Sequence, residues 1–348
     1  MKKYTIYIIS ILTMILTSCQ INKNYGVASF TFDDFKPIQL SQPNIIECDS
    51  LFMGKPGSIH FHPENFILIA DRRNVKLLHI IDLEDNSSVL DINPGRAQNE
   101  LLSVWDVTIK GNDVYLSSIY ENKLLKLHYN SVNRGFDFNG SIQFPQQFLR
   151  CIPYDTGYLT YASASSKDRF YMWDETINVV DTVGNFPVNG IISQVPLHNG
   201  VLQSDLGVCE NKIAAAYKGI DYIDVYKNLS LSKRIHGPLL TDVEVKERKF
   251  SNGSVATSLS PDMSIFSRVI ATDTGFYVGY VGYVSNGKDI PTSEDMSIKK
   301  ILHFTWDGKP DYVYILDRSI QDFAIDTESG VVYCLTASPE PDIISYML

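Results

Sequence analysis

Ser319–Leu348 holds three short segments of β-strand type, Ile320–Ile325, Val331–Leu335 and Ile343–Leu348, which turn-forming residues separate. Similar groups earlier in the chain continue into a fourth strand-like segment, whereas this group stops after its third. A strand without an outer neighbour would expose a row of unpaired backbone N–H and C=O groups. We therefore expect another part of the chain to pair with Ile343–Leu348.

The missing strand is expected to come from the beginning of the chain, within Thr31–Met53. Two stretches there, Pro37–Leu40 and Ile45–Cys48, alternate apolar and polar residues in the way that half-buried strands do. Pairing between this region and the last segment would join the two ends of the chain and close a ring.

A recurring turn sets the repeat of this ring. Each copy of the turn is followed at once by an apolar or aromatic residue, and the copies lie roughly fifty residues apart, a period typical of β-propellers. The six turns are Pro63–Asn65, Gly111–Asp113, Asp155–Gly157, Glu210–Lys212, Asp273–Gly275 and Glu328–Gly330. Residues 31–348 are therefore predicted to form one all-β domain, a six-bladed β-propeller whose last blade is completed by an N-terminal strand.

The composition agrees with this fold and excludes some partners. The chain is 44% hydrophobic and contains 20 Tyr and 17 Phe, which favour strands. A net charge of −10 argues against a nucleic-acid-binding surface, which needs a basic face, and no polybasic patch suited to anionic lipid is visible.

The N-terminus is predicted to be a targeting segment. Basic Met1–Lys3 is followed by the apolar stretch Tyr4–Leu16, which is too short to span a bilayer comfortably. Leu16–Cys19 resembles the lipobox of bacterial lipoproteins, which implies a signal peptide at residues 1–18, a lipid on Cys19 and a tether at 19–30. An ordinary signal peptide and an uncleaved anchor are the alternatives. Gln20 in place of aspartate implies attachment to the outer membrane, on a membrane face that the sequence leaves open.

Two local motifs carry a family resemblance. Gly95–Glu100 resembles a segment that follows the first blade of the TolB-like six-bladed propeller lipoproteins of Gram-negative bacteria, and Ile235–Pro238 resembles the end of their fourth blade. Ala97–Gln98 departs from the Gly-Pro that is usual in the first motif. The resemblance covers Ile45–Leu348 in architecture and implies a propeller located in the cell envelope, with no established reaction.

The first strand of each propeller blade lines the central channel, and here these strands carry a ring of alternating charge. Counting back from the turns gives Asp106, Arg150, Asp205, Arg268 and Asp322, with His60 or Ser58 in the first blade. Alternation lets each charge have an opposite neighbour, which buried charges need. This channel charge ring could be structural, or it could face a ligand.

A second group of charges is expected on one rim of the propeller, where a ligand could bind. Its candidate ligand-binding residues are Arg72, Arg73, Arg96, Glu100, Arg169 and Lys218. The long insertions Leu239–Ile265 and Gly282–Ser297 are further candidates for functional loops.

No catalytic, cofactor or metal site is predicted. His60 and His62 lie on one side of a strand without an evident third ligand, so they are interpreted as packed or rim histidines. The cysteines Cys151, Cys209 and Cys334 are interpreted as core residues; Cys48 is the fourth cysteine besides Cys19.

Two functions fit these features. The first is a non-enzymatic binding or scaffolding lipoprotein whose rim holds a protein segment or a small polar ligand, with the lipid as its only membrane contact. The alternative is a hydrolase or lyase that works from the channel with the charges of the ring.

Overall fold

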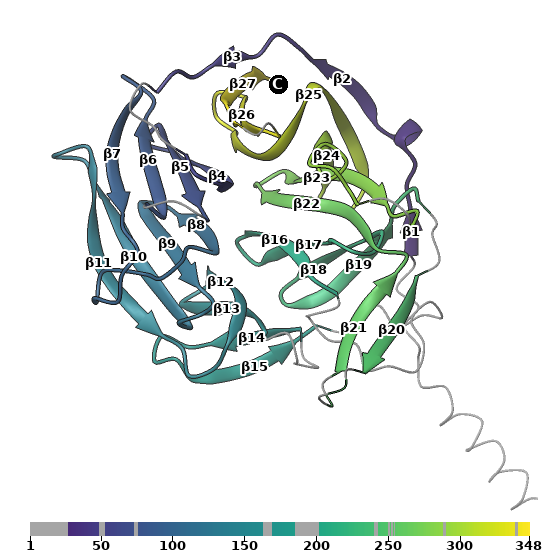
Figure 1. Ribbon diagram of the computed structural model, residues 1–348, viewed down its shortest axis with the longest axis horizontal. Coiled ribbons are helices and arrows are strands. Elements are labelled where there is room, and N and C mark those ends of the chain that lie inside the picture. Colours follow the sequence, from purple (N-terminus) through teal and green to yellow (C-terminus); the bar gives the residue numbers. More distant parts are fainter. Residues whose placement is uncertain are drawn as a thin grey trace, which may run out of the picture.

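The computed structural model describes residues 27–48, 53–72, 76–162, 169–184, 202–239, 243–249, 251, 253, 255–287, 290–337 and 340–348. The predicted signal peptide, Cys19, most of the tether and Arg73 lie outside these residues. The described chain forms β-sheets arranged around a central channel (Figure 1).

The first four blades are antiparallel four-stranded sheets, each running outward from the channel. Blade 1 consists of β4 (Pro56–His62), β5 (Phe66–Asp71), β6 (Leu78–Asp82) and β7 (Ser87–Ile92). Blade 2 consists of β8 (Asp106–Lys110), β9 (Asp113–Ser118), β10 (Lys123–Asn130) and β11 (Gly135–Gln143). Blade 3 consists of β12 (Phe148–Tyr154), β13 (Gly157–Ala162), β14 (Phe170–Trp173) and β15 (Val179–Val183). Blade 4 consists of β16 (Ser204–Cys209), β17 (Lys212–Tyr217), β18 (Tyr222–Lys227) and β19 (Ser230–His236).

Blades 5 and 6 share one long strand, β25 (Pro310–Asp326). Blade 5 consists of β22 (Met263–Ala271), β23 (Gly275–Val284), β24 (Ile298–Thr305) and the first half of β25. The second half of β25 becomes the inner strand of blade 6, followed by β26 (Val331–Thr336) and β27 (Ile343–Met347).

An N-terminal strand completes blade 6, which confirms the predicted six-bladed propeller and its closure. β3 (Asn44–Ile45) pairs antiparallel with β27, with Ile45 opposite Ile344, and the Ile46 N–H donates to the Ile343 carbonyl over 2.9 Å. The neighbouring candidate Pro37–Leu40 lies elsewhere: within β2 (Lys36–Leu40) it pairs in parallel with β25, outside blade 5.

A third short strand, β1 (Val27–Ser29), pairs in parallel with β19 outside blade 4. Residues 27–46 therefore run along the outer edges of blades 4, 5 and 6 (purple in Figure 1), and we call them the N-terminal belt. The belt is held by its aromatic residues as well as by its strands. Phe30, only 2% exposed, packs edge-on against Phe35 and Phe304, with ring centres 5.5 and 5.2 Å away. The short 3-10 helix η1 (Phe32–Asp34) lies between Phe30 and Phe35 in the sequence.

The recurring turns have a common backbone geometry. Asn65, Gly111, Asp155, Glu210 and Gly330 all have positive φ, between 49° and 70°. Asn, Asp and Gly tolerate this left-handed conformation better than other residues do, which accounts for their recurrence at these turns.

Apolar side chains of neighbouring blades form the core, and Cys151 and Cys334 are buried within it. Cys209 is only partly buried, and its thiol donates to Asp273 over 3.3 Å. Cys151, Cys209 and Cys334 carry free thiols. None of the described helices is long and apolar enough to cross a membrane.

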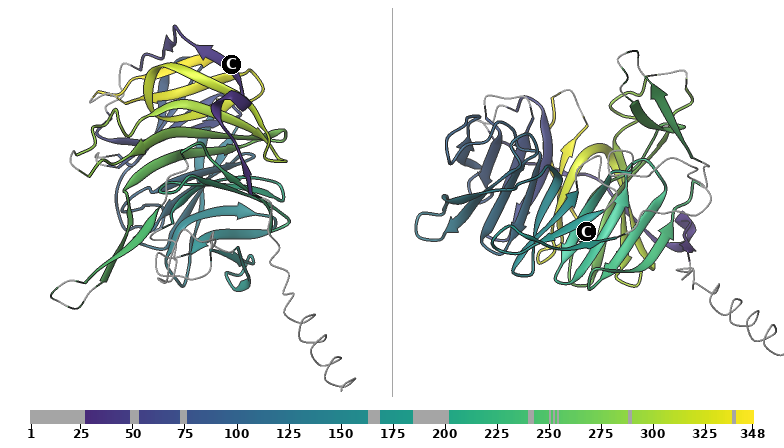
Figure 2. Two further views of the ribbon diagram at one scale, coloured as in Figure 1. Left: turned by 90° about the vertical axis from the view of Figure 1, so that its right-hand side faces the viewer. Right: turned by 90° about the horizontal axis from the view of Figure 1, so that it is seen from below.

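The insertion between blades 4 and 5 forms a hairpin of β20 (Glu244–Lys249) and β21 (Val255–Ser260), which projects from the propeller (green in Figure 2). Its two strands pair with each other and, in the described chain, with no other strand. At its base Leu259 packs so closely on Gly219 that a Cβ there would lie 2.6 Å from Leu259 Cδ1.

Burial of Asp221, just before β18, should make stability depend on pH. Burial raises its pKa to about 6, although the Leu239 N–H donates to its carboxylate over 2.5 Å. The unfolded carboxyl titrates near 3.8, so the folded state is penalised as pH rises from about 4 to 6 and carries the full penalty above that. We expect Asp221→Asn to be more stabilising, relative to wild type, at pH 7 than at pH 4. Urea unfolding at both pH values measures this difference, and equal effects at the two would contradict it.

Candidate functional site

The inner strands bring the five charges of the channel charge ring together, and Arg150 joins three blades. From β12 its Nε and Nη2 donate to the two carboxylate oxygens of Asp106 on β8, over 2.6 and 2.9 Å. Its Nη1 forms an ion pair with Asp205 on β16. All three side chains are at most 13% exposed, and one guanidinium thus gives both buried carboxylates an opposite charge as neighbour.

Arg268 on β22 joins the other three blades. Its Nη2 donates to the Ile59 carbonyl over 3.1 Å and to His60 Nδ1 over 2.8 Å, and its Nε lies 3.8 Å from Asp322 Oδ1. The Ile59 N–H in turn donates to Asp322 over 2.9 Å. Because arginine only donates, His60 accepts at Nδ1 and its protonated Nε2 can donate to Ser58 Oγ, 3.0 Å away.

Burial governs the protonation of this second group. It lowers the pKa of His60 well below its usual value, and the positive charges of Arg268 and Arg150 act in the same direction. His60 is therefore a neutral member of the ring. Burial also raises the pKa of Asp322, which the charge of Arg268 opposes.

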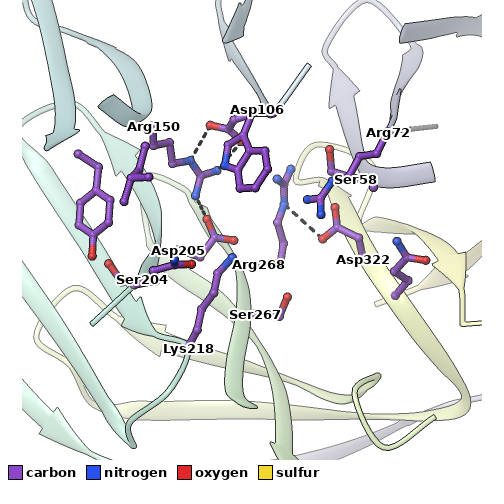
Figure 3. A pocket seen from close by; sticks show the side chains of 16 residues that line it. Ser58, Arg72, Asp106, Arg150, Ser204, Asp205, Lys218, Ser267, Arg268 and Asp322 are labelled. Carbon is purple, nitrogen blue, oxygen red and sulfur yellow. Dashed lines mark hydrogen bonds and ion pairs between the residues drawn. The ribbon is translucent and has the colours of Figure 1, made fainter. Parts of the chain in front are cut away.

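The ring divides the central channel into two unlike parts. On one side lies a polar cavity of about 330 Å³, into which Asp106, Asp205, Asp322, Lys218 and Arg72 project (Figure 3). On the other side lies a smaller space of about 150 Å³, lined mainly by apolar side chains such as Val107, Leu206 and Val269. Arg150 and Arg268 line both parts, so the paired charges form the floor of the polar cavity.

The polar cavity opens on the propeller face that carries the loops between the second and third strands of the blades; we call this the cavity face. Two cations from these loops line the cavity: Arg72, which follows β5, and Lys218, which follows β17. The Lys218 side chain is exposed to solvent at the cavity. Desolvation by the surrounding protein, together with the nearby positive charges of Arg150 and Arg72, lowers the pKa of Lys218 to about 8.

Exposed apolar side chains lie on the same face, on blade 2. Trp105 lines the cavity and is 39% exposed, and the guanidinium of Arg72 lies over its ring at 5.3 Å from the centre. Leu102 and Tyr120 are exposed nearby in the chain, in loops that a hydrogen bond from the Leu102 N–H to Glu121 connects over 2.7 Å. We call Leu102, Trp105 and Tyr120 the blade 2 apolar patch.

The other predicted rim residues do not line this cavity. Arg96 is exposed, and Glu100 folds back within its own loop to accept the Ala97 N–H over 2.8 Å. Arg73 lies outside the described residues.

The prediction that Arg169 lies at the rim is wrong. Its side chain is 0% exposed, 3.1 Å from Asp224 and 4.2 Å from the ring centre of Tyr217. Its position just before a strand gave no sign that it would be buried in an ion pair with Asp224 on a neighbouring blade.

The two histidines of β4 are packed within the protein. His60 belongs to the ring, and His62 lies against the rings of Tyr129 and Phe136 at 5.6 and 5.1 Å. In the described chain no group of three or more His, Cys, Asp or Glu side chains is arranged to hold a metal ion.

Ser58, named with His60 as a candidate for the first blade, lines the cavity. Several other cavity residues gave no signal in the sequence. They are Gly57, Trp105, Leu149, Tyr161, Gln203, Ser204, Ser267 and Gln321. Most are uncharged neighbours of the ring residues on the same inner strands, so the ring positions could have located them. None of the described residues of the Gly282–Ser297 insertion lines the cavity.

Fold and site together define a six-bladed β-propeller with a polar cavity closed from below by paired charges. The chain belongs to the TolB-like 6-blade propeller-like family, whose model matches residues 32–328. A comparison with curated protein sequences finds no match.

Two solved structures from Bacteroides show the same fold. A member of the DUF4221 family from Bacteroides vulgatus superposes with a TM-score of 0.56 at 12% identity, over 88% of this chain and 96% of that one. A protein from Bacteroides fragilis described as exported superposes with a TM-score of 0.54 at 12% identity, over 90% and 98%.

Proposed function

We propose that this protein is a non-enzymatic binding propeller that captures a small polar ligand or a protein segment at the polar cavity. The observation that carries the proposal is the pairing of the channel charges. Asp106 and Asp205 both accept from Arg150, and Asp322 accepts the Ile59 N–H close to Arg268. Carboxylates held in this way are suited to shaping a cavity floor, whereas the hydrolase or lyase alternative needs one of them to exchange protons with a substrate.

The blade 2 apolar patch supports a binding role as well. Exposed aromatic and aliphatic side chains beside a concave polar site commonly form part of a recognition surface. Trp105 belongs to both the patch and the cavity wall, so a ligand could contact the two together.

We further propose that the protein is exported and anchored by a lipid on Cys19, with outer-membrane attachment. The direction of the N-terminal belt indicates how the propeller would be oriented relative to the membrane. β1 runs parallel to β19, which begins on the face opposite the cavity and ends on the cavity face. A lipid on the N-terminal side of Val27 would thus leave the cavity face directed away from the membrane.

Capture from an envelope extract tests the binding proposal. We expect the purified protein to retain a ligand or protein segment, detected by mass spectrometry. A variant that fills the cavity, Ser267→Trp, should lose it while keeping its thermal unfolding transition. Retention of the same partner by Ser267→Trp would show that binding occurs elsewhere. Chemical conversion of the captured partner during prolonged incubation would favour the enzymatic alternative.

A further inference from the structure

The charges around the polar cavity do not balance. Four cations line it, Arg72, Arg150, Lys218 and Arg268, against the three carboxylates Asp106, Asp205 and Asp322. Arg150 and Arg268 lie against these carboxylates. In the described part of the chain, no carboxylate lies within ion-pair distance of Arg72 or Lys218. The lining of this concave site thus carries one more cation than carboxylates, in a chain of net charge −10.

The uncharged lining of the cavity is rich in hydrogen-bonding groups. Hydroxyls of Ser58, Ser204 and Ser267 and amides of Gln203 and Gln321 face it. Gln321 donates to the Pro56 carbonyl over 2.5 Å and Ser204 accepts from Arg169 over 3.0 Å, which leaves further donor and acceptor capacity on both side chains. Such a lining complements a ligand with several hydroxyl groups.

The position of Arg72 is set by its surroundings. Its guanidinium lies over the Trp105 ring at 5.3 Å, and Gly57 leaves the space that its side chain crosses. A Cβ added at Gly57 would lie 2.5 Å from Arg72 Nε. A planar guanidinium held in this way can bind a carboxylate or phosphate through two hydrogen bonds.

We propose that the polar cavity binds a small polyhydroxylated anion whose carboxylate or phosphate is held by Lys218 and Arg72. The proposal rests on the binding function above and specifies its ligand class. The volume of about 330 Å³ suits a molecule of monosaccharide size, at the lower end of ordinary ligand pockets. The hydroxyl groups of the ligand bond to the serine and glutamine side chains around it.

The charge of Lys218 makes this binding sensitive to pH and salt. The groups that face Lys218 are Arg150 and Arg72, which disfavour its charge, and Asp106 and Asp322, which favour it. Because its pKa is about 8, Lys218 loses its proton above this pH, and affinity for an anion falls. Added salt weakens the interaction further by screening.

Calorimetric titration at pH 7 and low salt tests the proposal with three probes: gluconate, glucose 6-phosphate and uncharged glucose. We expect at least one anion to bind, with glucose at least tenfold weaker. Lys218→Gln and Arg72→Gln should each weaken anion binding by tenfold or more. Gly57→Ala should weaken it by displacing Arg72. The control Lys309→Gln removes an exposed lysine from a turn on the opposite face and should bind as wild type does.

Each outcome has a defined meaning. Binding of gluconate alone or of glucose 6-phosphate alone supports the proposal and identifies the anionic group. Binding of glucose as tight as that of the anions, unaffected by Lys218→Gln, would overturn the anion assignment and leave the binding function intact. If none of the three probes binds, or if both cavity variants bind like Lys309→Gln, the proposal is wrong. Capture from the envelope extract then decides separately whether the cavity binds anything.

Discussion

Phe30→Ala is expected to lower the free energy of unfolding by about 3–5 kcal/mol, the usual cost of truncating a buried phenylalanine. Phe30 lies in the N-terminal belt and packs against Phe35 and Phe304, so its loss leaves a cavity between the belt and blade 5. Because the belt also supplies β3, the strand that closes blade 6, we expect loosening of the belt to loosen the closure. Denaturant unfolding measures the loss.

The matched control is Phe138→Ala, the same chemical change on an outer strand of blade 2, where the side chain is 41% exposed. We expect Phe138→Ala to lower the free energy of unfolding by less than about 1 kcal/mol, because little apolar surface is lost from the core. If Phe30→Ala were as mild as Phe138→Ala, the belt would not be an integral part of the propeller.

Arg150→Met is expected to destabilise the protein by about 3–5 kcal/mol, since it leaves Asp106 and Asp205 buried without their common counter-charge. The loss should shrink as pH falls, because protonation of the two carboxyls removes the unpaired charge. Thermal unfolding of wild type and variant between pH 4 and 8 measures both effects.

The triple variant Arg150→Met/Asp106→Asn/Asp205→Asn provides the comparison. The triple variant removes the uncompensated buried charges and leaves only neutral amides, which cost less to bury, so it should recover part of the lost stability. A triple variant less stable than Arg150→Met would show that the charges do not act as one group.

Much of the fold could be predicted because each blade repeats one pattern of strand and turn. Residues with positive φ, such as Asn65 and Gly330, mark the turns directly in the sequence. The unfinished last blade indicated that an N-terminal strand completes it, as β3 does. The parallel pairing of β1 and β2 outside blades 4 and 5 could not be foreseen, because strand alternation does not specify a partner.

The site was predictable only where geometry follows from the repeat. Ring residues such as Asp106 and Arg268 occupy equivalent places on inner strands, so counting from the turns brings them to one level. Loop charges have no such register. Arg72 and Lys218 line the cavity, whereas Arg169 is buried against Asp224. Only the packing of neighbouring blades distinguishes these two outcomes.

Fluorescence quenching tests most directly whether the cavity mouth is an accessible, positively charged site. Trp105 is 39% exposed beside Arg72, whereas the other two tryptophans, Trp173 and Trp306, are buried, so Trp105 should dominate quenching by ions. With each ion's quenching expressed relative to its quenching of free N-acetyltryptophanamide, we expect iodide to exceed caesium, and this excess to fall in the double variant Lys218→Gln/Arg72→Gln. Equal relative quenching by the two ions in the wild-type protein, unchanged in the double variant, would contradict the assignment of surplus positive charge to this cavity.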